Sequence, residues 1–159
     1  MKITFICVGT VKKSYVKDGV LDYLKRIGAY ATVESVDIKE AGYRGKAPVE
    51  EALRKEGERI LKALKPADFA VVLADSGRQY PSAGFADFIN AFLGGGRSGK
   101  KNLAFIVGGP YGLHPSVVKA ASMILSLSAM TLPHDLARLV LAEQVYRAFT
   151  IIKNEPYSH

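Results

Sequence analysis

This chain has only one cysteine, and its sequence shows no long apolar run and no N-terminal leader pattern. The single cysteine, Cys7, lies in an apolar segment, so no internal disulfide can form, and we expect it to fill the core of a protein in a reducing compartment. Nowhere do 18 apolar residues run together, and residues 1–8 carry no signal-peptide pattern. These absences argue against a membrane or secreted protein and favour a soluble, cytoplasmic one.

Patterns for metal binding and for hydrolase nucleophiles are also missing. The three histidines, His114, His134 and His159, lie 20 or more residues apart without the cysteine pairs or His–Glu spacing of a metal site, so we predict no metal. Ser126 and Ser128 lack the Gly-x-Ser-x-Gly setting of a hydrolase nucleophile. Their hydroxyls are therefore expected to form hydrogen bonds within a loop.

The stretch 94–101 imitates two phosphate-binding motifs. Residues 94–99 match Gly-x-Gly-x-x-Gly, and residues 94–100 approach a P-loop. Both motifs need a preceding strand and a following helix, whereas this stretch follows a predicted helix and leads into a predicted strand. Lys101 also stands where a P-loop needs Ser or Thr. We interpret residues 94–101 as a flexible basic connection that could lie near RNA phosphates.

The length and charge of the chain bound its domain count and its partners. With 159 residues, 48% of them hydrophobic, it is long enough for one well-buried core and too short for two comfortable domains, so we predict a single domain over residues 1–159. Its 22 Lys and Arg outnumber 15 Asp and Glu, giving a formal net charge of +7. This charge favours an anionic partner such as nucleic acid, although a solvated basic surface would have the same composition.

Strand and helix patterns alternate along the chain. The first predicted helix has one apolar face made of Val16, Val20, Leu21, Leu24 and Ile27. The alternation predicts an α/β fold, in which helices cover both faces of a mainly parallel sheet. The predicted strands are residues 3–8, 32–38, 69–74, 103–107 and 124–127, and the predicted helices are residues 14–27, 48–64, 82–93 and a last helix from Pro133.

Two predicted strand ends and one helix start come together in the last third of the chain. Residues 103–107 lead into a glycine-rich turn at 108–113, residues 124–127 lead into a polar loop, and the last helix begins at Pro133. In open α/β sheets, ligands bind beyond the carboxyl ends of the strands, where backbone amides are unpaired. The order predicts a ligand site, and the alternative is that the glycines merely form a tight turn.

The last helix is apolar around almost its whole circumference between residues 136 and 152. A helix of this kind must be buried on more than one side. One side can pack on the sheet, and a domain this small leaves a second subunit as the natural cover for the other. We therefore predict a homodimer, and the alternative is deep burial within a single chain.

Three segments resemble one known family. Residues 108–113 (Gly-Gly-Pro-Tyr-Gly-Leu), 127–134 (Leu-Ser-Ala-Met-Thr-Leu-Pro-His) and 143–149 (Glu-Gln-Val-Tyr-Arg-Ala-Phe) resemble the ribosomal RNA large subunit methyltransferase H family, pseudouridine-N3 methyltransferases of the SPOUT class. The likeness covers essentially the whole chain, from residues 8–10 to residues 155–157. It implies an α/β fold with a C-terminal trefoil knot, a homodimer, and S-adenosylmethionine bound at the knot.

The resemblance also implies which residues bind the methyl donor. They lie at the end of the third strand, in the glycine turn and in the loop before the last helix: Leu73, Gly108, Leu127, Ser128, Ala129, Met130, Thr131 and Leu132. Adenine needs apolar walls and backbone hydrogen bonds, which these residue types can supply. Because S-adenosylmethionine carries no phosphate, the failed phosphate motifs are no objection.

By the same resemblance, the acceptor is N3 of a pseudouridine in 23S rRNA, recognised in the assembled ribosome. That nitrogen must lose a proton before its lone pair can attack a methyl group. His159, Glu143 and water are the candidate bases. Tyr157 and Arg147 are candidates to orient the base or the uracil. Ser158 stands where the family often has histidine, so no role is carried over to that position.

Ordinary structural roles would also account for these candidates. Glu143 and Arg147 have the spacing of an i,i+4 helix pair, and Tyr157 and His159 could belong to a frayed terminus. Contacts to RNA phosphates are expected on the basic surface of the dimer. The candidates for these contacts are Lys12, Lys13, Arg44, Lys46, Arg97, Lys100 and Lys101.

Two rival functions remain at this point. A nucleotide-dependent oxidoreductase or phosphotransferase would use residues 94–100, and binding of NAD or ATP without S-adenosylmethionine would favour it. A non-enzymatic ribosome-binding factor would rest on charge alone, and it would bind ribosomes without consuming the methyl donor.

Overall fold

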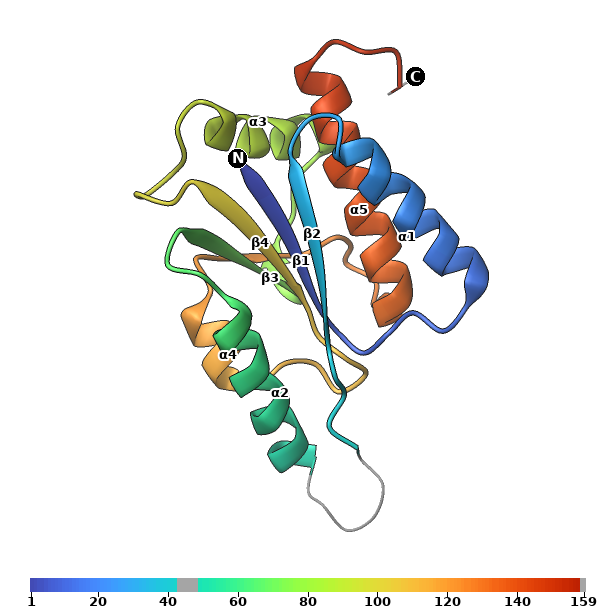
Figure 1. Cartoon of the computed structure of the whole chain (residues 1–159), viewed down its shortest axis with the longest axis vertical. Coiled ribbons are helices and arrows are strands. Elements are labelled where there is room, and N and C mark those ends of the chain that lie inside the picture. The colour runs from blue at the N-terminus through green and yellow to red at the C-terminus, as the bar shows by residue number, and fades with distance from the viewer. Residues whose placement is uncertain (43–48, 158–159) are drawn as a thin grey trace.

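A parallel sheet forms the middle layer of the molecule (Figure 1). The structure, a computed structural model, describes residues 1–42 and 49–157, and within them five strands all pair in parallel. Their order across the sheet is β2-β1-β4-β3-β5, with β4 in the centre. The strands are β1 (Lys2–Val8), β2 (Thr32–Ile38), β3 (Asp68–Arg78), β4 (Asn102–Val107) and β5 (Met123–Leu125).

Helices cover both faces of the sheet (Figure 1). α1, α3 and α5 pack against one face, and α2 and α4 pack against the other. The helices are α1 (Ser14–Ile27), α2 (Val49–Ala63), α3 (Ser82–Leu93), α4 (Pro115–Ala120) and α5 (His134–Ile152). The predicted α/β fold is therefore confirmed, and α1, β2 and α3 have the predicted bounds.

The side chains of the central strand β4 alternate between two cores. Leu103, Phe105 and Val107 join the core under α1, α3 and α5, whereas Ala104 and Ile106 join the core under α2 and α4. Successive side chains of a strand point to opposite faces of the sheet. Because both faces are covered, the strand is apolar at nearly every position, which is typical of buried parallel strands.

β3 is longer than the apolar pattern predicts. The pattern ends at Ala74, but the strand continues to Arg78 after an irregularity, because both Leu73 and Arg78 pair with Leu125 of β5. A Cβ at Gly77 would lie 2.5 Å from the carbonyl carbon of Leu125, so only glycine allows this close approach. Residues 75–78 lack the apolar pattern of a strand, and pairing with β5 extends β3 through them.

Two short elements also differ from the prediction. β5 ends at Leu125 rather than Leu127, because the chain turns there into the loop that leads to α5. α4 has no predicted counterpart, since six residues are too few to establish a helical period. Its start is marked by His114, whose Nδ1 accepts a hydrogen bond from the backbone N–H of Ser116 at 3.3 Å.

α5 is buried on more than one side, as predicted, and its own chain supplies much of the cover. α1 and α3 both pack against it, and a Cβ at Gly19 of α1 would lie only 2.9 Å from Cδ1 of Leu139. Leu136, in its first turn, is 37% exposed. Among residues 1–42 and 49–157 no helix, α5 included, has the length and apolar character needed to cross a bilayer.

Candidate functional site

A cavity of about 790 Å³ lies at the carboxyl ends of β3, β4 and β5, beside the start of α5. This volume is within the range of about 300–1,000 Å³ that is usual for small-molecule sites. Its walls come from residues 72–75, 107–110, 112–113, 125–128 and 130–134, together with Val118 and Ala137. The strand ends and the helix start that the sequence places in one region therefore enclose one cavity.

The glycine turn after β4 forms one wall of this cavity. The backbone N–H of Gly112 donates to the carbonyl oxygen of Gly109 at 3.0 Å, and Gly112 has a φ of 83°. A Cβ at Gly108 would lie 2.7 Å from the carbonyl oxygen of Gly112 and 2.9 Å from Cγ of Leu113. The glycines thus make a tight turn, and that turn also lines the cavity, so the ligand site stays a prediction.

The loop after β5 forms the opposite wall and is held by serine hydroxyls. Oγ of Ser126 donates to the carbonyl oxygen of Ser128 at 2.9 Å, and Oγ of Ser128 accepts from the backbone N–H of Met130 at 2.9 Å. The backbone N–H of Ser126 also donates to the carbonyl oxygen of Arg78 at 3.0 Å. The prediction that these hydroxyls bond within the loop is confirmed.

The residues that the resemblance assigns to the methyl donor gather at this cavity. All of them except Ala129 line it: Leu73, Gly108, Leu127, Ser128, Met130, Thr131 and Leu132. Met130 does so while its side chain is 76% exposed. Asp75 adds a carboxylate to the mainly apolar wall. Within residues 1–42 and 49–157, no three potential metal-ligating side chains come together.

The candidates for catalysis form a second cluster, at the far end of α5. Nε of Arg147 donates to Oε1 of Glu143 at 2.8 Å, and the hydroxyl of Tyr157 donates to the same oxygen at 3.3 Å. The hydroxyls of Tyr23 and Tyr157 lie 3.1 Å apart, and the ring of Tyr157 lies 4.7 Å from that of Tyr146. Tyr157 is thus bonded and half-buried rather than frayed, whereas His159 and Ser158 lie outside the described residues.

Charge and burial set the protonation of this cluster. Burial, followed by the hydrogen bond with Tyr23, raises the pKa of Tyr157 well above its ordinary value, so the phenol stays protonated at neutral pH. The hydrogen bond to Glu143 raises the pKa of Arg147. The i,i+4 ion pair between Glu143 and Arg147, which was the alternative to a catalytic role, is present. Glu143 also accepts a hydrogen bond from Tyr157.

The second cluster, called the tyrosine cluster below, comprises Tyr23, Glu143, Tyr146, Arg147 and Tyr157. Within one chain, the cavity and this tyrosine cluster are far apart. His134 lines the cavity and Arg147 belongs to the cluster, and 13 residues of α5 separate them. At 1.5 Å per residue this separation is about 20 Å along the helix, and it is still about 15 Å from Ala137, the last residue of α5 that lines the cavity. A single chain therefore does not bring the predicted donor-binding and catalytic residues together.

Three residues that the sequence did not single out support these two sites. Gly77 allows the approach of β3 to β5, and Tyr23 holds Tyr157. Arg138, 5% exposed, donates from Nη2 to the carbonyl oxygen of Gly9 at 2.9 Å. A charged residue within this mainly apolar helix was the signal available for Arg138, whereas the other two depend on long-range contacts.

The predicted phosphate contacts lie in two regions. Lys12 and Lys13 precede α1, and Arg97, Lys100 and Lys101 lie in the connection from α3 to β4. Arg44 and Lys46 lie outside the described residues. Because residues 94–101 follow a helix and lead into a strand, they present no helix N-terminus to a phosphate. The rejection of the nucleotide-binding motifs is thereby confirmed.

Comparison with known proteins places the chain among methyltransferases. The family model described as "Predicted SPOUT methyltransferase" matches residues 1–159. The Ribosomal RNA large subunit methyltransferase H of Desulforamulus reducens is 42% identical over 160 residues, covering 99% of this chain and 98% of that protein. The protein of the same name from Exiguobacterium sibiricum is 39% identical, covering 99% of each.

Two solved structures share the fold. A probable methyltransferase from Bordetella pertussis aligns with a TM-score of 0.57 at 18% identity, over 92% of this chain and 93% of its own. A probable methylase family protein from Haemophilus influenzae aligns with a TM-score of 0.55 at 13% identity, over 99% of this chain and 70% of its own. With its full length matched in sequence and its fold shared with these proteins, the chain belongs to the SPOUT methyltransferase family, alongside the ribosomal RNA large subunit methyltransferase H proteins.

Proposed function

We propose that this chain transfers a methyl group from S-adenosylmethionine to N3 of a pseudouridine in the large-subunit rRNA of the assembled ribosome, in the cytoplasm. The names of relatives about 40% identical over the full length support the rRNA substrate. The observation that carries the donor site is the cavity, because every residue implied by the resemblance except Ala129 lines it.

The cavity suits the chemistry of this methyl donor. Leu73, Leu127 and Leu132 offer apolar walls to a flat purine, and Gly108 allows the tight turn that forms another wall, because a Cβ there would meet the turn's own atoms. The carboxylate of Asp75 offers negative charge to a cation. When bound, S-adenosylmethionine supplies an electrophilic methyl group on a positively charged sulfur.

The protein's task is mainly to align the acceptor, because an in-line displacement needs little covalent machinery. The raised pKa of Tyr157 makes its phenol a hydrogen-bond donor rather than a base. Arg147 can likewise only donate. Arg147, which has more N–H groups than its bonds to Glu143 use, would donate to a carbonyl oxygen of the uracil ring, and Tyr157 would hold Glu143 in place through its single O–H.

A homodimer would bring the two sites together. If two copies pair with their α5 helices antiparallel, the tyrosine cluster of one copy lies beside the cavity of the other, since the two sites occupy opposite ends of α5. The exposed Leu136 would be covered in the same contact. We extend the proposal to a single domain over residues 1–159 with a C-terminal trefoil knot, which membership of the SPOUT family implies.

Transfer of labelled methyl groups tests this proposal. Purified protein and labelled S-adenosylmethionine are incubated in three parallel reactions, each with one substrate. The substrates are assembled ribosomes, separated large subunits and protein-free rRNA, all from cells that lack the modification. We expect label in rRNA with assembled ribosomes. No transfer to any of the three substrates by a folded protein would refute the proposal, and transfer only to protein-free rRNA would refute its assembled-ribosome part.

A further inference from the structure

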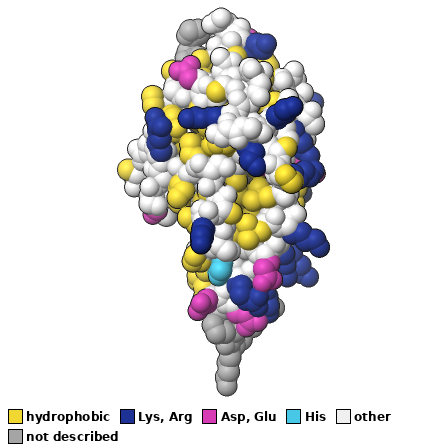
Figure 2. Space-filling view, turned by 90° about the vertical axis from the view of Figure 1, so that its left-hand side faces the viewer, with side chains coloured by type: hydrophobic (Ala, Val, Ile, Leu, Met, Phe, Trp, Pro, Cys, Tyr) yellow, Lys and Arg dark blue, Asp and Glu magenta, His cyan; other side chains and the backbone are white. Residues whose placement is uncertain are grey.

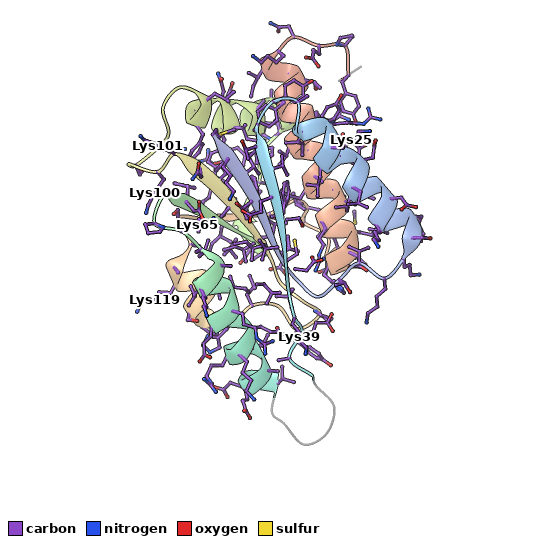
Figure 3. All side chains as sticks on the ribbon, in the orientation of Figure 1. Lys25, Lys39, Lys65, Lys100, Lys101 and Lys119 are labelled. Carbon is purple, nitrogen blue, oxygen red and sulfur yellow. The ribbon has the colours of Figure 1, made fainter. Side chains whose placement is uncertain are left out.

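Lysines gather along the side of the molecule at which β3 and β4 begin. Figure 3 labels Lys65, Lys100, Lys101 and Lys119 along this side, which faces the viewer in Figure 2. There, Lys and Arg side chains are spread over most of the face, and Asp and Glu lie mainly toward its lower end, beside further Lys and Arg. We define the amino-edge cluster as the cations that precede β3 and β4: Lys65, Arg97, Lys100 and Lys101.

A tight turn holds two of these cations face to face. The backbone N–H of Arg97 donates to the carbonyl oxygen of Lys100 at 2.9 Å, and the reverse bond has the same length. Ser98 and Gly99 both have positive φ, 51° and 74°, as in a type I′ turn. Like charges placed opposite each other in this way are destabilising. The turn therefore places two cationic residues next to each other just before β4.

Backbone contacts fix this turn against the loop before β3. The N–H groups of Lys101 and Asn102 donate to the carbonyl oxygen of Ala67 at 3.1 and 3.2 Å. Nζ of Lys100 donates to the carbonyl oxygen of Pro66, next to Lys65. The turn and this loop therefore hold the cluster together without any ion pair.

The carboxylates near the cluster are already engaged. Glu34 forms an ion pair with Lys2, and Asp68 is 6% exposed and accepts a hydrogen bond from the backbone N–H of Lys65 at 2.9 Å. Across residues 1–42 and 49–157, no ion pair includes a member of the cluster. The four cations of the cluster thus outnumber these two nearby carboxylates, and such an excess of positive charge attracts a polyanion.

We propose that the amino-edge cluster binds the phosphate backbone of rRNA away from the nucleotide that is methylated, an inference that rests on the proposed function. The six residues of β4 lie between the cluster and the cavity, and at about 3.3 Å per residue they span about 17 Å. One nucleotide cannot occupy both places, but a folded RNA can. The cluster is thus an anchor that raises affinity without contacting the methyl donor.

A pair of matched double variants tests this anchor. Lys65→Gln/Lys101→Gln removes two charges from the cluster, and Lys17→Gln/Lys25→Gln removes two from exposed positions of α1. Binding of protein-free large-subunit rRNA is measured over a range of salt concentrations. Each lost phosphate contact should lower the slope of log affinity against log salt by about 0.7–0.9. For the cluster variant we expect the slope to fall by the amount that corresponds to one or two lost phosphate contacts. For the control variant we expect the wild-type slope.

Further readouts separate this inference from the proposed function. The cluster variant should bind S-adenosylmethionine like the wild type, and its KM for ribosomes should rise with kcat unchanged. An unaltered salt slope, or an equal loss in the control, would overturn the inference. A loss of affinity for ribosomes without a loss of affinity for protein-free rRNA would also overturn the inference, because it would indicate an acidic ribosomal protein as the partner. If the wild type binds rRNA but transfers no methyl group, the proposed function fails, and the salt slopes still decide the anchor.

Discussion

Nη2 of Arg138 donates a hydrogen bond to the carbonyl oxygen of Gly9 at 2.9 Å, and it also donates to the carbonyl oxygen of Val8. Val8 in turn packs against the glycine turn, since a Cβ at Gly109 would lie 3.2 Å from its Cγ1. The buried guanidinium therefore links the start of α5, which lines one side of the cavity, to the strand that supports the other side.

Arg138→Met should lower the stability of the protein. It leaves two backbone carbonyls at the end of β1 without this donor, and an unsatisfied buried group costs about 1–3 kcal/mol. We expect the free energy of unfolding in urea to fall by at least about 2 kcal/mol. Arg54→Met is the control, because Arg54 forms an exposed pair with Glu58 that contributes about 0.5 kcal/mol or less. Equal stability of the two variants would contradict the linking role of Arg138.

Gly108→Ala should weaken binding of S-adenosylmethionine at least tenfold. The added Cβ would lie 2.7 Å from the carbonyl oxygen of Gly112, so the turn that lines the cavity must shift. Gly84→Ala is the matched control, since a Cβ there meets nothing nearer than 3.5 Å. Calorimetry gives the affinities, and circular dichroism verifies that both variants are folded. Wild-type affinity in a folded Gly108→Ala variant would place the donor elsewhere.

Tyr157→Phe should slow methyl transfer and leave donor binding unchanged. The substitution removes the hydroxyl that bonds to Tyr23 and Glu143, but it keeps the ring that packs on Tyr146. Single-turnover transfer to ribosomes should fall at least tenfold, while calorimetry should give the wild-type affinity for S-adenosylmethionine. An unchanged transfer rate would remove Tyr157 from the site.

Mixing two impaired variants tests whether each working site draws on two chains. In a mixed dimer of Gly108→Ala and Tyr157→Phe chains, one site combines an intact cavity with an intact tyrosine cluster. Refolding the two variants together should therefore give faster transfer, at a limiting concentration of S-adenosylmethionine, than either variant alone. If the mixture transfers no faster than the single variants although mixed dimers form, the antiparallel arrangement of α5 is wrong.

Stability should fall in alkaline solution in a way that depends on Tyr30. Its phenol donates to a carboxylate oxygen of Glu155, and this bond raises the pKa of Tyr30 from 10.0 to about 12. The folded chain thus keeps the proton to higher pH than the unfolded chain, so the contribution is complete below pH 10 and is lost as the pH rises toward 12. Urea unfolding over this range should show a shallower decline for Tyr30→Phe than for the wild type. Tyr15→Phe, at a side chain that is 65% exposed, should keep the wild-type slope.

Local patterns predicted most of the fold, and long-range contacts account for what they missed. The bounds of α1 follow from its helical spacing, yet Leu21 is 54% exposed although the same pattern places it on the apolar face. The extension of β3 depends on pairing between Arg78 and Leu125 across the chain, which no local window contains.

The candidate site was predictable in part. The order of strands, turn and helix predicted a cavity at the carboxyl ends, and the resemblance supplied the residues that line it. The distance along α5 between that cavity and Arg147 could not be predicted, because it depends on the bounds of the helix and on which of its residues line the cavity. The support that Arg138 and Tyr23 give to the two sites likewise depends on contacts between distant segments.

The most direct test of the central claim identifies the methylated nucleoside. Ribosomes lacking the modification are incubated with the protein and isotopically labelled S-adenosylmethionine, and their rRNA is digested and analysed by mass spectrometry. Our account predicts the label on N3-methylpseudouridine from the large-subunit rRNA and on no other nucleoside. Label on a different nucleoside, or none at all from a protein that binds the donor, would contradict it.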